Sequence, residues 1–120
     1  MCKSKIQRAV VTETNLFYQG SITIDAKLMR EADILPYERV QVANLTSGKR
    51  LETYVIEGAE DSGMICMNGA AARCAEVGDL VLVISYAVMT DEESRRIEPR
   101  VVHVDAKNRI ARVETKPSHP

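Results

Sequence analysis

Short extended segments rich in β-branched residues recur along this 120-residue chain, and they limit its fold more than any other feature. Eight of them are separated by clusters of turn-forming residues: 6–12, 21–24, 40–44, 50–56, 64–67, 80–86, 101–104 and 109–113. Helical features are confined to short stretches after Asp25, Gly69 and Thr90. The chain is therefore expected to form one mainly β domain. Its core must be aliphatic, because Trp is absent and aromatic residues make up only 4%.

The middle of the chain predicts a β-hairpin, in which residues 40–44 and 50–56 flank a turn. Because successive side chains of a strand alternate, Thr53 should face one side of the return strand, while Arg50 and Tyr54 face the other.

Other segments predict particular local structures. The uninterrupted apolar run at 80–86 is typical of a strand buried on both faces. Asp25 is expected to cap a helix, and Thr90 begins the pattern of a capping box. Residues 101–104 and 109–113 form a last hairpin, and the tail at 115–120 is expected to be disordered.

A weak internal repeat links the two halves. Residues 38–42 and 79–83 both follow a short helix and a turn, and 79 minus 38 gives an offset of 41 residues. Two copies of a strand-helix-strand unit favour a small barrel with pseudo-twofold symmetry.

Composition and cysteine usage narrow the classes of partner and cofactor. A formal net charge of −1 gives no electrostatic basis for binding nucleic acid, and no apolar run is long enough to span a membrane. The three cysteines are odd in number and lack CxxC spacing, and the two histidines lie apart from them. We therefore expect neither a disulfide framework nor a metal site, and a cytoplasmic protein with reduced thiols.

Gly20-Ser21 joins two extended segments and is a bond that the chain could cut by itself. The serine hydroxyl can attack the preceding carbonyl, converting the amide to an ester through an oxyanion. β-Elimination would then free a chain ending at Gly20 and leave dehydroalanine, which hydrolyses to a pyruvoyl group in place of Ser21. An isolated Gly-Ser pair is more often an ordinary turn.

Residues 68–72, Asn-Gly-Ala-Ala-Ala, form a strand-to-helix junction. Such a junction is either a close-packed corner or a place where free N–H groups at a helix start bind a carboxylate.

These signals occur together in a specific order: Lys5-Ile6-Gln7-Arg8-Ala9, Tyr18-x-Gly20-Ser21-x-Thr23-Ile24-Asp25, Asn44-x-x-x-Gly48-x-Arg50-x-x-Thr53-Tyr54, Asn68-Gly69-Ala70-Ala71-Ala72 and Gly78-Asp79. The combination closely resembles the aspartate 1-decarboxylase family, pyruvoyl-dependent enzymes that make β-alanine for pantothenate. The resemblance covers about residues 3–108, nearly the whole domain.

The resemblance implies a double-psi β-barrel over residues 1–114, self-cleaved into 1–20 and 21–120 and assembled as a homotetramer with active sites between subunits. It implies L-aspartate as substrate, and a pyruvoyl group without pyridoxal phosphate or metal. The ketone would condense with the substrate amine and take up the electrons that decarboxylation releases. Self-cleavage would proceed either unaided or with an accessory maturation protein as partner.

The resemblance also assigns roles to individual residues. Ser21 becomes the pyruvoyl group, and Thr53 assists cleavage near the Gly20 carbonyl. Tyr54 serves as proton donor. The remaining residues bind substrate or line the pocket: Lys5, Tyr18, Arg50, Asn68, Gly69, Ala70 and Ala71.

One position departs from the family pattern, since Gln7 stands where a histidine is usual. Gln7 can donate a hydrogen bond to a carboxylate, but it cannot titrate near neutrality, so substrate affinity or its pH dependence would change.

The sequence also allows two other interpretations. Residues 21–25 and 34–42 also resemble the swapped-hairpin DNA-binding domain of AbrB-type regulators, although those domains are shorter and basic. A barrel that keeps the family core without cleaving is the other alternative.

Overall fold

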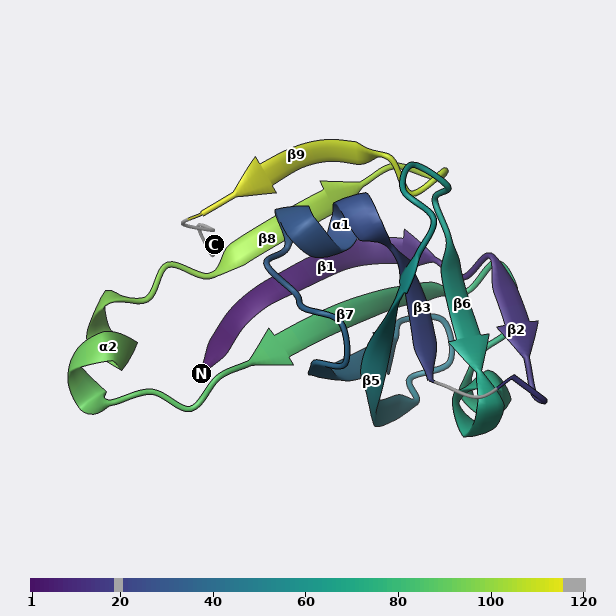
Figure 1. Ribbon diagram of the computed structural model, residues 1–120, viewed down its shortest axis with the longest axis horizontal. Coiled ribbons are helices and arrows are strands. Elements are labelled where there is room, and N and C mark those ends of the chain that lie inside the picture. Colours follow the sequence, from purple (N-terminus) through teal and green to yellow (C-terminus); the bar gives the residue numbers. More distant parts are fainter. Residues whose placement is uncertain (19–20, 116–120) are drawn as a thin grey trace.

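The computed structural model describes residues 1–18 and 21–115 (Figure 1). Within them, nine strands form one sheet in the order β2-β6-β3-β5-β4-β7-β1-β8-β9. The strands are β1 (Cys2–Val10), β2 (Glu13–Asn15), β3 (Ile22–Asp25), β4 (Arg39–Asn44), β5 (Arg50–Gly58), β6 (Ile65–Asn68), β7 (Leu80–Tyr86), β8 (Arg100–Val104) and β9 (Ile110–Glu114). The helices are α1 (Ala26–Glu31), the 3-10 helix η1 (Gly69–Cys74) and α2 (Asp91–Arg96). In the described part, no helix is both long and apolar enough to cross a membrane.

In the part of the strand order that runs from β2 to β1, the first and last strands are joined by the short connection between β1 and β2. Val11 N–H donates to the carbonyl of Asp79, just before β7, at 2.9 Å. The next residue, Thr12, donates to the carbonyl of Ile65 in β6, also at 2.9 Å. The chain therefore passes from one end of this order to the other within two residues, and β8 and β9 extend the sheet beyond β1.

The two copies of the internal repeat are related by a local pseudo-twofold symmetry, which is visible in how their strands pair. β4 pairs antiparallel with β7, and at the centre of this pair Val42 faces Val83. The separation of 83 minus 42 is 41 residues, the offset of the repeat. β3 and β6 pair antiparallel in the same way, with Ile24 facing Ile65, again 41 residues apart (65 minus 24). The two strand-helix-strand units thus lie side by side as matched copies.

The core lies between these paired strands and α1. Its fully buried large side chains come from both repeats and from the N-terminal strand: Ile6, Ile22, Ile24, Leu28, Ile65, Met67, Val11, Val40, Val42, Val55, Val81 and Val83. Each such side chain contributes roughly 1.5–3 kcal/mol by leaving water. β1 is thus as deeply built into the fold as the strands that follow residue 21.

Two capping predictions are confirmed. The Asp25 carboxylate accepts from the N–H groups of Lys27, Asp61 and Gly63, at 2.9, 3.1 and 2.9 Å. It therefore caps α1 and also holds the loop between β5 and β6. Thr90 and Glu93 form a reciprocal capping box at the start of α2. Figure 1 shows α2 on an excursion between β7 and β8, apart from the main body.

Three expectations about strands require correction. The first strand spans Cys2–Val10 instead of 6–12, and β2 was not anticipated because its sequence, Glu-Thr-Asn, has little strand propensity. β7 is not buried on both faces, because Val81, Val83 and Ser85 are buried while Leu80, Leu82 and Ile84 are half-buried.

The helix expected after Gly69 is a 3-10 helix, Gly69–Cys74. The expected disorder of the tail falls mostly on residues 116–120, outside the described residues.

Acid stability should depend on Asp79, which links β4 to the turn before β7. Its carboxylate accepts from the Asn44 side chain at 2.8 Å and from Glu76 N–H at 2.9 Å, and these bonds hold the pKa of Asp79 below its ordinary value. This stabilisation is complete above the ordinary pKa and is lost as pH falls through the lower folded-state pKa. We expect Asp79→Asn to lower Tm near neutrality, and the difference from wild type to shrink toward pH 2 in calorimetry. A constant difference across this range would contradict the assignment.

Candidate active site

Ser21 lies directly before β3, between two neighbouring strands. Ile22 pairs with Val55 of β5 in parallel and with Met67 of β6 antiparallel. Extending these registers by one residue places Ser21 level with Tyr54 on one side and with Asn68 on the other. Ser21 as a residue is partly exposed. Gln19 and Gly20, with the predicted scissile carbonyl, lie outside the described residues.

Asn68 connects Ser21 to the turn that follows β6. Its backbone N–H donates to the carbonyl oxygen of Ser21 at 2.8 Å, and the residue is 2% exposed. Gly69 then takes a φ of 57°, a conformation that glycine adopts without steric cost. Ala70 is exposed and Ala71 is buried. The predicted pocket segment 68–71 therefore begins with a residue that is hydrogen-bonded to Ser21.

β5 presents two predicted site residues to opposite sides at the level of Ser21. Thr53 is partly buried and faces inward with Val55, whereas Tyr54 is 40% exposed and faces outward. This alternation confirms the orientation predicted for the strand. The inward hydroxyl of Thr53 and the outward phenol of Tyr54 are thus available for different chemical steps.

Arg50 begins β5 on the same outward side as Tyr54. Four residues of extended chain separate their Cα atoms by about 13 Å. The Arg50 guanidinium lies 3.4 Å from the side-chain oxygen of Gln41, which also accepts from the Tyr86 hydroxyl at 3.2 Å. Gln41 was not anticipated as a site residue. The predicted hairpin brings β4 and β5 together, but the contact between Gln41 and Arg50 depends on the register between these strands, which the sequence does not give.

Lys5 lies on the same surface but three strands away from β5. It pairs with Ile84 of β7, Ile84 pairs with Gln41 of β4, and Gln41 pairs with Glu52 of β5. Three strand spacings amount to about 14 Å. The structure therefore does not bring Lys5 next to Ser21 of its own chain.

We call the outward side of β1, β7, β4 and β5 the outer sheet face; its members include Lys5, Gln41, Arg50, Tyr54, Leu82, Ile84 and Tyr86. A depression of about 190 Å³ opens on this face, lined by Arg39, Val40, Gln41, Glu52 and Tyr86. Arg39 and Glu52 form an ion pair across it. The face therefore combines half-buried apolar side chains with charged ones.

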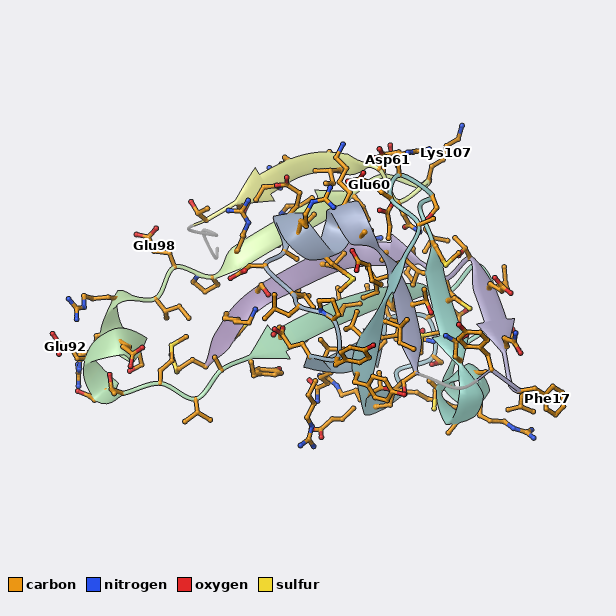
Figure 2. The ribbon with its side chains drawn as sticks, viewed as in Figure 1. Phe17, Glu60, Asp61, Glu92, Glu98 and Lys107 are labelled. Carbon is orange, nitrogen blue, oxygen red and sulfur yellow. The ribbon has the colours of Figure 1, made fainter. Side chains whose placement is uncertain are left out.

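Two predicted positions lie at the edges of this arrangement. Tyr18 is 52% exposed, and its backbone N–H donates to the carbonyl of Asn15. Its neighbour Phe17 is 93% exposed and points away from the strands (Figure 2). Gln7 pairs with His103 of β8, next to a register shift in β1 where Arg8 has a φ of 60°.

Within residues 1–18 and 21–115, no group of three or more His, Cys, Asp or Glu side chains is placed to hold a metal ion. Cys2, Cys66 and Cys74 are all free thiols. Burial raises the pKa of the Cys66 thiol, and the nearby charge of Glu13 adds to this effect. Cys66 is therefore a neutral thiol at physiological pH.

Comparison with known proteins supplies the family. The family described as "Aspartate decarboxylase" matches residues 1–111. A protein named "Aspartate 1-decarboxylase" from Thermoanaerobacter pseudethanolicus is 59% identical over 109 residues, covering 91% of this chain and 93% of the relative. A protein of the same name from Pelotomaculum thermopropionicum is 58% identical over 119 residues, covering 99% and 90%. One from Acetivibrio thermocellus is 53% identical over 119 residues, covering 99% and 94%.

Matches that extend over nearly the whole of both chains define this protein as a decarboxylase, a lyase that breaks a carbon–carbon bond. The chain belongs to the aspartate decarboxylase family.

Proposed function

We propose that this protein converts L-aspartate to β-alanine and carbon dioxide, after cutting its own chain between Gly20 and Ser21 and forming a pyruvoyl group at position 21. The observation that carries the proposal is the position of Ser21, level with Tyr54 on one side and hydrogen-bonded through its carbonyl to Asn68 on the other. The product, β-alanine, would serve pantothenate biosynthesis, and the free thiols suit a cytoplasmic enzyme.

The surroundings of Ser21 fit such a group. A pyruvoyl residue keeps the carbonyl of position 21, and Asn68 N–H already donates to that oxygen. Residue 21 is only partly covered by the rest of the chain, which suits access by a small amine. We assign Thr53 to the cleavage step, in which its hydroxyl stabilises the oxyanion formed when the Ser21 hydroxyl attacks the preceding carbonyl.

When formed, the pyruvoyl group supplies the electron sink for decarboxylation. The chain's own residues must orient the substrate and manage the proton. Asn68 N–H withdraws electron density from the carbonyl of residue 21 and fixes its plane. Tyr54 faces outward at the level of Ser21, so its hydroxyl is assigned to deliver a proton to the carbon that loses carbon dioxide. Gly69 allows the backbone of the 68–71 turn to approach the substrate closely.

Arg50 is assigned to bind one substrate carboxylate, because a guanidinium recognises a carboxylate through two parallel hydrogen bonds. We expect Arg50→Ala to lower kcat/KM for aspartate by about 10- to 100-fold while self-cleavage proceeds, since loss of a charge-assisted bond costs about 1.5–3 kcal/mol. Arg50→Lys should recover only part of the loss, and Arg95→Ala in the distant α2 is a matched control. Steady-state kinetics on fully cleaved protein measures this, and an unchanged kcat/KM would remove Arg50 from the site.

We further propose that the barrel has the double-psi topology and assembles as a homotetramer, with each site completed by a neighbouring subunit. Two observations support this arrangement. Lys5 lies about three strand spacings from β5 of its own chain. The outer sheet face also leaves Tyr54 and Tyr86 exposed at 40% and 52%. A second copy would cover this face and could bring its own Lys5 to the substrate.

Sedimentation and mixed oligomers test the assembly. We expect a tetramer at assay concentrations. Mixing a Lys5→Ala subunit with a Ser21→Ala subunit should restore part of the activity, because intact Lys5 from one chain would meet an intact residue 21 of the other. A fully active monomer would contradict shared sites.

The activity itself is tested by measuring β-alanine and carbon dioxide from L-aspartate with purified protein. A barrel that keeps the family core without cleaving is the competing proposal, and it predicts one uncut band on a denaturing gel and no product. Cleavage that begins only after addition of cell extract would identify an accessory maturation protein as a partner.

A further inference from the structure

The side chain of Asn68 is held at both of its polar atoms inside the protein. Its amide nitrogen donates to the Thr23 hydroxyl at 2.9 Å, and its amide oxygen accepts from the Cys66 thiol at 2.9 Å. The same residue gives its backbone N–H to the carbonyl of Ser21 at 2.8 Å. Asn68 therefore links the position of residue 21 to two side chains outside the proposed catalytic set.

Thr23 and Cys66 face one another across the antiparallel pair β3 and β6. Cys66 is 5% exposed, and burial raises the pKa of its thiol, so the thiol keeps the proton that it donates to Asn68. Both partners are thus fixed on rigid strands rather than on loops.

The orientation of Thr23 is also constrained from the opposite side. A Cβ added at Gly58 of β5 would lie 2.9 Å from the Thr23 methyl carbon, so this methyl packs directly against the Gly58 backbone. With the methyl held there, the Thr23 hydroxyl remains directed to Asn68. The absence of a side chain at Gly58 is therefore part of the same arrangement.

We propose that Thr23 and Cys66 are positioning residues for this enzyme, which hold Asn68 so that its backbone N–H remains on the carbonyl of residue 21 and the 68–71 turn begins at a fixed place. The inference rests on the proposed function, and it adds two residues that neither touch substrate nor enter the reaction. Loss of either hydrogen bond leaves a buried amide group of Asn68 unpaired, which favours a shift of this residue.

Matched pairs of variants separate this role from ordinary packing. Thr23→Val keeps the methyl against Gly58 and removes the hydroxyl, whereas Thr23→Ser keeps the hydroxyl and removes the methyl. Cys66→Ala removes the donor, and Cys66→Ser replaces the thiol with a hydroxyl that can still donate. Cys74→Ala, at a half-buried cysteine outside the network, is the control.

We expect Thr23→Val and Cys66→Ala to slow both self-cleavage and kcat by about 10- to 100-fold, as small displacements in an active site do. KM for aspartate should change little, and the two serine variants should recover most of the loss. A purely structural role predicts instead a lower Tm with unchanged cleavage rate and kcat in the folded protein, and this result would overturn the inference.

Amide hydrogen exchange gives a readout that does not depend on activity. We expect the Asn68 N–H to exchange faster in Thr23→Val and Cys66→Ala than in wild type and Cys74→Ala, even in a Ser21→Ala background that cannot be cut. If exchange accelerates but wild type neither cleaves nor makes β-alanine, the positioning network is supported and the proposed function fails. If wild type is active and exchange is unchanged in the variants, the positioning inference fails alone.

Discussion

Ser21→Ala should abolish both self-cleavage and aspartate decarboxylation. Alanine lacks the hydroxyl that attacks the preceding carbonyl, so neither the ester nor the pyruvoyl group can form. The substitution keeps the backbone carbonyl to which Asn68 donates, and this partly exposed residue loses only one oxygen, so the fold should persist. Intact mass spectrometry and an assay for β-alanine measure the two effects on one sample.

Ser94→Ala is a suitable control for this experiment. Ser94 lies in α2, and its hydroxyl donates to the carbonyl of Asp91 in the same helix. This variant should be cut and active like wild type. An active Ser21→Ala protein would show that the electron sink does not come from residue 21.

Tyr54→Phe should lower kcat by about 10²- to 10⁴-fold, the usual contribution of a positioned general acid. The change removes one hydroxyl from a side chain that is 40% exposed, so folding should be retained. Self-cleavage should also be retained, because the residue assigned to assist that step is Thr53, whose hydroxyl faces inward. Slow protonation would leave time for the proton to reach the wrong carbon. Protonation there transaminates the pyruvoyl group and thereby inactivates it. We therefore expect activity to decay faster during turnover than in wild type.

Tyr37→Phe tests whether loss of any exposed phenol has this effect, since Tyr37 is 78% exposed and lies before β4. Progress curves of β-alanine formation, with cleaved protein at equal concentration, compare the variants. Unchanged kcat and unchanged inactivation in Tyr54→Phe would move the proton donor to another group.

The features that the sequence predicted correctly depend on local chemistry. The hairpin of β4 and β5, the inward Thr53 and outward Tyr54, and the cap at Asp25 all follow from alternation, turn residues or a single side chain next to free N–H groups. The repeat offset of 41 was also readable, and it reappears as the separation of Val42 and Val83 across paired strands.

Features that depend on pairing between distant segments were not predictable from these patterns. β2 forms because its backbone pairs with β6, even though its side chains have little strand preference. The half-burial of Leu82 and Ile84 reflects which face of β7 is left uncovered within one chain. The separation of Lys5 from Ser21 likewise follows from strand order, which no local motif contains.

The contacts of Asn68 show the same limit at the level of single atoms. Thr23 and Cys66 lie 43 residues apart (66 minus 23), and their relation to Asn68 appears only once β3 and β6 are in register. Sequence motifs included Asn68 and Thr23, but they assigned no role to Thr23 and gave no reason to examine Cys66.

Intact mass measurement of the purified wild-type protein, combined with end sequencing, shows directly whether the chain cuts itself between Gly20 and Ser21. We expect two fragments, Met1 to Gly20 and residue 21 to Pro120, with the larger one lacking a free amino terminus because the amine of residue 21 has been lost. A single uncut chain that nevertheless makes β-alanine from aspartate would contradict this expectation.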